Sequence, residues 1–175
     1  NIDTLITEGT MLNRNDECIH ECKVSEKMAN VMKAFKYVFV LASATDIERL
    51  ASIKNASSEA KKTLYVCSNF MASTMKFFTE RESSLSRGLF NFSPRMLRLN
   101  GLDRIKKKGF VLIAGTSQIS GVKKLLKELP IEETLLIYSS WEGYYTIPEQ
   151  IAANPGYKNF RELFYNIVDI HTSGH

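Results

Sequence analysis

The sequence predicts an α/β fold with three layers, in the order helix, sheet and helix, around a mainly parallel sheet. Short runs rich in β-branched and aromatic residues alternate with segments whose apolar residues recur at helical spacing, which is typical of parallel strands joined by crossover helices. The length of 175 residues suits one compact domain, and 44% hydrophobic with 24% charged residues is an ordinary globular composition.

Six segments have the composition of strands. Each is a short apolar or alternating run bounded by polar residues, and the predicted strands are residues 2–7, 37–41, 63–67, 110–114, 134–138 and 165–170. Apolar runs of this length are far too short to cross a bilayer, so we expect no membrane association.

Two helices are predicted in the first third of the chain. The first precedes strand 37–41 and has apolar residues at helical spacing from Val24 to Phe35. The second begins at Thr45, because Thr45 and Glu48 have the spacing of a capping box, in which each side chain satisfies the other residue's backbone amide.

Three further helical elements are expected. Ser68 and Asn69 stand where a helix begins, and Met71, Met75 and Phe78 form its apolar stripe. The others are a helix over residues 122–129, ended by Pro130, and a short element over residues 159–164.

Polar residues follow the carboxyl ends of the predicted strands. They are Ser43 to Thr45, Ser68 and Asn69, Gly115 to Ser117, and Ser139 to Tyr144. In parallel sheets this edge forms the functional crevice, and hydroxyl, amide and glycine groups there suit phosphate or sugar contacts. The alternative is that these residues only cap helices.

The net charge of +4 is unevenly distributed. Residues 81–108 hold eight basic and two acidic residues, so this segment carries +6 and the rest of the chain −2. A positive segment on a slightly acidic body is a candidate surface for tracking phosphates. The alternative is an ordinary solvated face.

The residues provide no complete active site by themselves. No zinc-binding His-x-His-x-Asp-His string, nucleotide-binding glycine fingerprint or Gly-x-Ser-x-Gly turn is present. The cluster of Cys18, His20 and Cys22 lacks a fourth ligand, and its members diverge on a helix. Three cysteines cannot all pair within the chain, which favours a reducing cytoplasm.

Three short motifs occur in order along the chain. They are Ile6-Thr7-Glu8-Gly9-Thr10 with Arg14 after it, Ser43-Ala44-Thr45-Asp46-Ile47-Glu48-Arg49, and His171-Thr172-Ser173-Gly174-His175. Together they resemble the β-CASP region of metallo-β-lactamase-fold nucleases, which include ribonuclease J, the cleavage factor of messenger-RNA 3′-end processing and DNA cross-link repair nucleases. The resemblance implies a Rossmann-like β-CASP cap with short flanking strands of the lactamase fold.

The resemblance also implies roles for particular residues. Glu8 would orient a metal-ligand histidine or a water beside it, and His175 would hydrogen-bond the scissile phosphate or protonate the leaving oxygen. The residues expected to bind phosphate or nucleic acid are Thr10, Arg14, Ser43, Arg49, Ser139, Trp141, Tyr144 and Ser173.

For the whole protein, the resemblance implies an RNA-processing hydrolase of the metallo-β-lactamase superfamily, whose zinc is held by residues outside this chain. Residues 1–14 would be the lactamase junction, 15–165 the β-CASP domain, and 166–175 the return strand and final motif. The expected partners are RNA, with single-stranded DNA as the alternative, and the lactamase-fold half; a homodimer is left open. By itself the chain is expected to be inactive. The alternative function is a non-catalytic module for nucleic-acid binding or protein assembly.

Overall fold

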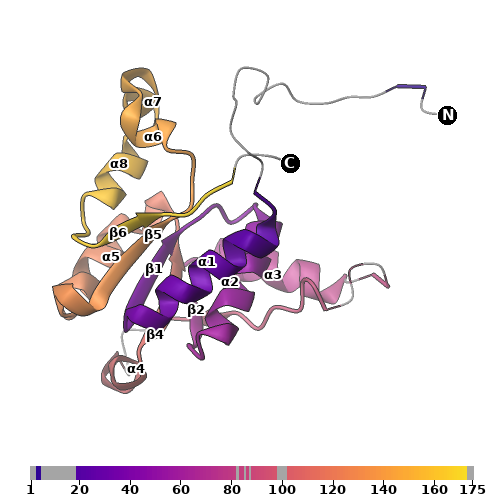
Figure 1. Ribbon diagram of the computed structural model, residues 1–175, viewed down its shortest axis with the longest axis horizontal. Coiled ribbons are helices and arrows are strands. Elements are labelled where there is room, and N and C mark those ends of the chain that lie inside the picture. The colour runs from indigo at the N-terminus through magenta and orange to yellow at the C-terminus, as the bar shows by residue number, and fades with distance from the viewer. Residues whose placement is uncertain are drawn as a thin grey trace.

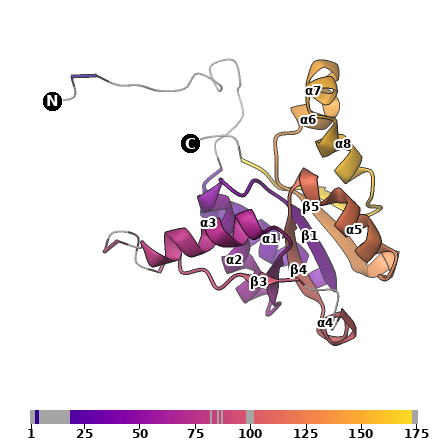
Figure 2. The same cartoon turned by 180° about the vertical axis from the view of Figure 1, so that it is seen from behind.

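The computed structural model describes residues 3–4, 19–81, 83–84, 86, 88–97 and 102–172. Its fold confirms the predicted class, because six parallel strands form one sheet with helices on both faces (Figures 1 and 2). The strands are β1 (Tyr37–Leu41), β2 (Leu64–Val66), β3 (Arg95–Met96), β4 (Phe110–Ala114), β5 (Thr134–Tyr138) and β6 (Ile167–Asp169). The α-helices are α1 (Glu21–Ala34), α2 (Ile47–Glu59), α3 (Asn69–Glu80), α4 (Leu102–Lys108), α5 (Ile119–Leu126), α6 (Gly143–Thr146), α7 (Pro148–Ala153) and α8 (Pro155–Arg161).

The strands lie in the order β3-β2-β4-β1-β5-β6, so the first strand of the sheet in the chain is at its centre. Tyr37 of β1 is in register with Phe110 of β4 on one side and with Thr134 of β5 on the other. All residues of these three strands are buried, as expected for a parallel sheet that is covered on both faces.

One face of the sheet is covered by α1, α2 and α3. Their buried apolar residues pack with alternate side chains of the central strands, and this core includes Met28, Met32, Val38, Val40, Leu50, Ile53, Met71, Met75, Val111, Ile113 and Ile137. The opposite face is covered mainly by α5 and α8, with α4 at its border, and its core includes Phe39, Leu41, Phe110, Leu112, Val122, Leu125, Leu136, Tyr138, Phe160 and Phe164.

The predicted strands at residues 37–41, 110–114 and 134–138 are confirmed with the same bounds. The capping box at Thr45 is wrong. Helix α2 begins at Ile47, and the Asp46 carboxylate caps it by accepting a hydrogen bond from the backbone amide of Arg49 at 3.1 Å. Thr45 instead hydrogen-bonds to Ser43 in the preceding turn.

Helix α4 lies at the amino-terminal edge of the sheet, at the bottom of Figure 1. Gly109 joins it directly to β4 with a positive φ of 72°, and a Cβ atom there would lie 2.5 Å from the carbonyl oxygen of Lys36. Only glycine fits this junction without strain. Among the described helices, none is both long and apolar enough to cross a membrane.

Candidate functional site

The carboxyl ends of the three central strands meet at one edge of the sheet. The Ser139 amide donates to the Leu41 carbonyl at 3.1 Å, and the Ala42 amide donates to the Ala114 carbonyl at 3.3 Å. After β1 the chain enters α2 on one face, whereas after β4 it enters α5 on the other. Neighbouring strands whose connections leave in opposite directions create a crevice, so this edge is the candidate site.

Arg49 lies at the centre of this edge, in the first turn of α2, and its side chain is only 1% exposed. Its Nε and Nη2 donate to both carboxylate oxygens of Glu21 at 2.7 to 3.2 Å. Its Nη1 donates to the Ser139 hydroxyl at 2.5 Å. The predicted residues Arg49 and Ser139 are therefore brought together, but the guanidinium has little surface to offer to a substrate phosphate.

The same guanidinium holds the chain where it leaves β6. Arg49 Nη1 lies 3.2 Å from Nδ1 of His171, and Nη2 donates to the Thr172 carbonyl at 3.4 Å. One buried cation thus connects the start of α1, the end of β5 and the exit of β6.

Glu21 is the first residue of α1, and its side chain is 28% exposed. The Ser52 hydroxyl donates to its Oε2 at 2.7 Å, in addition to the hydrogen bonds from Arg49. Partial burial opposes ionisation of this carboxyl, but the hydrogen bonds and the positive charge outweigh it, so the pKa of Glu21 lies below its ordinary 4.5. The Glu21–Arg49 pair is therefore ionised at neutral pH.

Ser43 is exposed just beyond the end of β1. Its hydroxyl lies 2.8 Å from the Thr45 hydroxyl and accepts a hydrogen bond from the Thr45 amide at 3.2 Å. Ser139, by contrast, is only 4% exposed. Of the two predicted serines, Ser43 is the one that a ligand in the crevice can reach.

Three aromatic residues follow β5, and all are partly buried. The ring of Tyr144 stacks on Tyr157 of α8 at 4.3 Å between centroids, and Trp141 meets the edge of Tyr144 at 5.5 Å. Tyr145 is occupied elsewhere, because its hydroxyl donates to Asp169 at 3.1 Å and Arg161 lies over its ring. One face of the Tyr144 ring is likewise covered by Tyr157, so the exposed parts of Trp141 and Tyr144 are the candidates for stacking on a base.

An apolar pocket of about 250 Å³ lies near the carboxyl ends of β2 and β4, and Cys67, Leu97, Leu112, Gln118, Gly121, Val122 and Leu125 line it. The Cys67 thiol donates to the Ile113 carbonyl at 3.6 Å. Burial raises its pKa from 9.0 to about 11, so this cysteine is a thiol rather than a nucleophilic thiolate at neutral pH.

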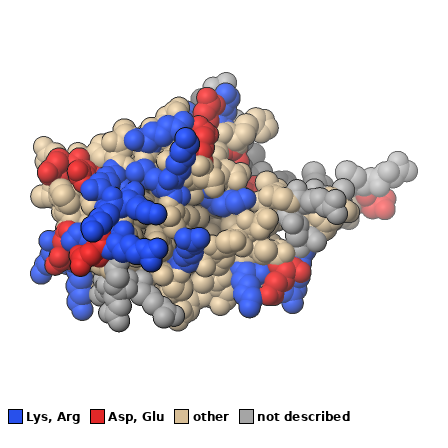
Figure 3. Space-filling view, turned by 90° about the horizontal axis from the view of Figure 1, so that it is seen from below, with Lys and Arg blue, Asp and Glu red and all other residues tan. Residues whose placement is uncertain are grey.

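The positive segment predicted at residues 81–108 does not converge on this crevice in its described part. The lysines of α4, namely Lys106, Lys107 and Lys108, precede β4 and so lie at the opposite, amino-terminal edge of the sheet. Figure 3 views the molecule from that side and shows Lys and Arg side chains gathered there, with fewer acidic ones among them.

Several predicted site residues lie outside the described residues: Glu8, Thr10, Arg14, Ser173 and His175. Within the described part, the sequence analysis missed Glu21, Ser52 and the contact of His171 with Arg49. No local pattern marks Glu21, because its partner is 28 residues away and the packing of α1 on α2 brings the two together.

The described residues include no group of three or more His, Cys, Asp or Glu side chains that could hold a metal ion. They therefore offer no ligand set for the zinc that the motif resemblance implies. In comparisons with known proteins, no family model matches this chain, and no curated protein matches it significantly.

Proposed function

We propose that this chain is the β-CASP-like cap of a zinc-dependent, cytoplasmic nuclease, and that the cap holds an RNA strand at the carboxyl edge of its sheet. The observation that carries the proposal is the Arg49 network. It fixes His171 and Thr172 beside the ends of the central strands, and the Ser-Gly-His motif follows these two residues directly in the sequence. The zinc ligands belong to other parts of the protein.

The chemistry of this edge supports contact with a nucleic-acid strand. Ser43 offers an exposed hydroxyl, and Trp141 and Tyr144 offer partly exposed rings on which bases can stack. Arg49 acts as a positioning residue, since its guanidinium binds protein groups. Neutral donors and aromatic rings of this kind favour a single strand, whose bases are free to stack.

Binding of a short single-stranded RNA to the 175-residue chain tests the proposal, followed by fluorescence anisotropy of a labelled strand. Tyr144→Ala should weaken binding about fivefold or more, because stacking contributes roughly 1–3 kcal/mol per base. Tyr165→Ala is the matched control, since Tyr165 is 86% exposed and precedes β6 at the other edge of the sheet. Equal affinities of the two variants would contradict an RNA site at the carboxyl edge.

A nuclease assay with added zinc tests the assignment as a cap. The chain should show no turnover, because its sequence contains no zinc-binding His-x-His-x-Asp-His string. Robust turnover that is lost in Glu8→Gln would instead show that this chain contains a complete active site. In that case the cap assignment is wrong.

One observation favours the alternative of a non-catalytic nucleic-acid-binding or assembly module: the lysines of α4 lie at the edge opposite the crevice. If this surface binds RNA, Lys107→Gln with Lys108→Gln should reduce affinity and its salt dependence, whereas Tyr144→Ala should not. The two sets of variants therefore separate the two functions.

A further inference from the structure

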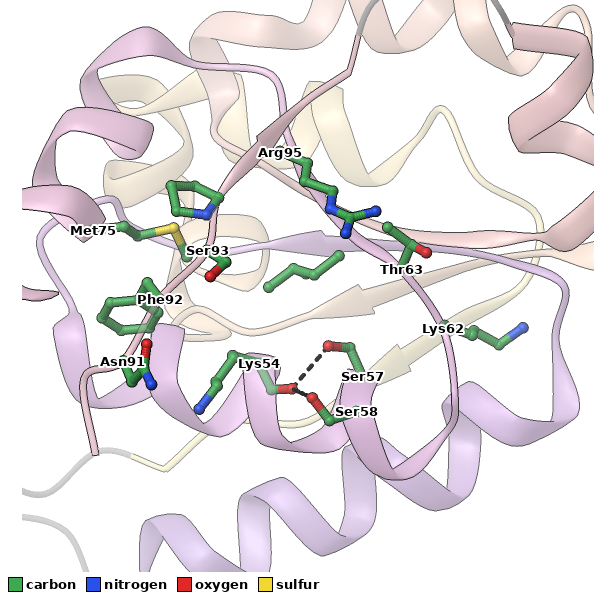
Figure 4. Close-up of a pocket in the computed structure, with 12 residues that line it drawn as sticks. Lys54, Ser57, Ser58, Lys62, Thr63, Met75, Asn91, Phe92, Ser93 and Arg95 are labelled. Atoms are coloured by element: carbon green, nitrogen blue, oxygen red, sulfur yellow. Dashed lines mark hydrogen bonds between the residues drawn. The ribbon is translucent and has the colours of Figure 1, made fainter. Parts of the chain in front are cut away.

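A second pocket, of about 410 Å³, lies at the amino-terminal edge of the sheet and on the face covered by α2 and α3. Figure 4 shows its walls, which come from the last turns of α2, the starts of β2 and β3, and the segment before β3. The lining residues are Lys54, Ser57, Ser58, Lys62, Thr63, Leu64, Met75, Asn91, Phe92, Ser93, Pro94 and Arg95. It is separate from the crevice at the carboxyl edge.

The pocket is positively charged, since its lining includes three cations and no carboxylate. Neither Lys54 nor Arg95 forms an ion pair within the described part of the chain. The Lys62 ammonium donates to the Lys36 carbonyl at 3.2 Å, and burial together with the Lys36 charge lowers its pKa. The pocket therefore has positive charge that no described carboxylate neutralises.

The pocket also offers neutral hydrogen-bonding groups. No hydrogen bond to a described residue occupies the side chains of Thr63, Asn91 or Ser93, and in Figure 4 the Arg95 guanidinium extends toward Thr63. Ser57 and Ser58 differ, because their hydroxyls donate to the Lys54 carbonyl at 2.8 and 3.0 Å. Figure 4 thus places Arg95 and Thr63 at one end of the pocket and Lys54 and Asn91 at the other. A guanidinium beside a hydroxyl group is a pair of donors that suits phosphate oxygens.

One side of the pocket is apolar. Met75 and Phe92 are buried there, and Leu64 and Pro94 complete this wall. A phosphate group attached to an apolar ring system would satisfy both sides at once. The volume is also in the range of sites for small ligands, roughly 300–1,000 Å³.

We propose that this pocket binds a nucleoside monophosphate, with the phosphate held by Arg95 and Thr63 and the base or sugar against Phe92 and Met75, at the end where Lys54 lies. The unit is either a free nucleotide or one residue of a nucleic-acid strand. This site is additional to the proposed RNA contact at the carboxyl edge and does not depend on it.

Calorimetric titration of the 175-residue chain with adenosine 5′-monophosphate, and separately with a hexamer of riboadenosine, tests the proposal. Lys54→Gln with Arg95→Gln should reduce the affinity for at least one of these ligands by tenfold or more. The matched control is Lys27→Gln with Arg81→Gln, which removes the same charges from exposed residues outside the pocket and should change affinity less than twofold. Thermal unfolding of both variants verifies that they fold.

The outcomes separate the sources of the phosphate and the two sites. Saturable binding of the mononucleotide that the pocket variant loses assigns a free nucleotide, and loss of hexamer binding alone assigns a strand. Equal losses in the pocket and control variants, or no saturable binding of either ligand, overturn the proposal. Trp141 is the single tryptophan, so quenching of its fluorescence by the hexamer reports binding at the carboxyl edge. This quenching should be the same in the parent protein and in the pocket variant. A failure of binding at one site therefore does not hide binding at the other.

Discussion

The guanidinium of Arg49 holds both carboxylate oxygens of Glu21, and this pair joins α2 to α1 at the crevice edge of the sheet. Through Ser139, His171 and Thr172, the same guanidinium also fixes the end of β5 and the exit of β6. A single side chain therefore sets the relative positions of the segments that shape the crevice. Its loss should affect both stability and the geometry of the site.

Arg49→Met should lower the free energy of unfolding by about 2–3 kcal/mol. Removing one partner of a fully buried ion pair costs about 3–5 kcal/mol, and the value is smaller here because Glu21 keeps some contact with water. Urea unfolding of the two proteins measures the difference.

The control for this prediction is Lys23→Met, which breaks an exposed pair with Glu26 whose side chains are 66% and 57% accessible. Such pairs contribute about 0–1 kcal/mol. If Arg49→Met lowers the free energy of unfolding by no more than Lys23→Met does, the Arg49 network does not organise the crevice. A destabilisation that is smaller in Glu21→Gln/Arg49→Met than the sum of the single effects would show direct coupling.

Glu21 should make the protein sensitive to acid. Its folded-state pKa lies below 4.5, so the unfolded chain binds more protons in acid, and the stability contributed by Glu21 is present above about pH 4.5 and lost as the pH falls through the folded pKa. Glu21→Gln should therefore lose less stability than the parent protein between about pH 5 and pH 3. The midpoints of urea unfolding across this pH range measure the effect, and Glu26→Gln is the exposed control. If the midpoints of the parent protein and Glu21→Gln fall in parallel with pH, the prediction is wrong.

Gly109 should tolerate no side chain. In Gly109→Ala the new Cβ meets the Lys36 carbonyl oxygen at 2.5 Å, and the positive φ adds strain, so we expect a loss of more than about 1 kcal/mol. Gly121→Ala is the contrasting variant. It lies within α5 with open space around its Cβ position, and it should gain about 0.5–1 kcal/mol from helix propensity. Thermal unfolding compares the two variants. Destabilisation by Gly121→Ala as well would mean that the space around the Gly121 Cβ position is filled in the protein.

The central strands could be predicted from the sequence because both of their faces are buried. Residues 37–41, 110–114 and 135–138 are continuous apolar runs, which is the pattern that burial on two faces produces. Strand β3 has no such pattern, since it is only two residues long and lies at the edge of the sheet. The starts of helices α7 and α8 are indicated in the sequence, because each helix has a proline at its first position, namely Pro148 and Pro155.

The candidate site could be predicted only in part. Ser43 and Ser139 were predicted because polar residues that follow the carboxyl ends of parallel strands line the crevice, and Arg49 was predicted from the motif resemblance. The Glu21–Arg49 pair and the cationic pocket around Arg95 depend on how helices and loops pack across the sheet. Such contacts join residues that are distant in sequence, so no local spacing indicates them.

Cys67 should react slowly with thiol reagents, because burial raises its pKa to about 11 and only the thiolate reacts. In Cys18→Ser/Cys22→Ser, where Cys67 is the single cysteine, the alkylation rate should keep rising with pH beyond the ordinary thiol pKa of 9.0. In urea the alkylation rate of the same variant should level off just above pH 9.0, because unfolding removes the burial that raises the pKa of Cys67. Iodoacetamide labelling followed by mass spectrometry gives both profiles. A plateau near 9.0 in the folded protein would mean that water reaches the thiol, so that the apolar pocket beside Leu112 and Val122 is open enough to admit a polar ligand.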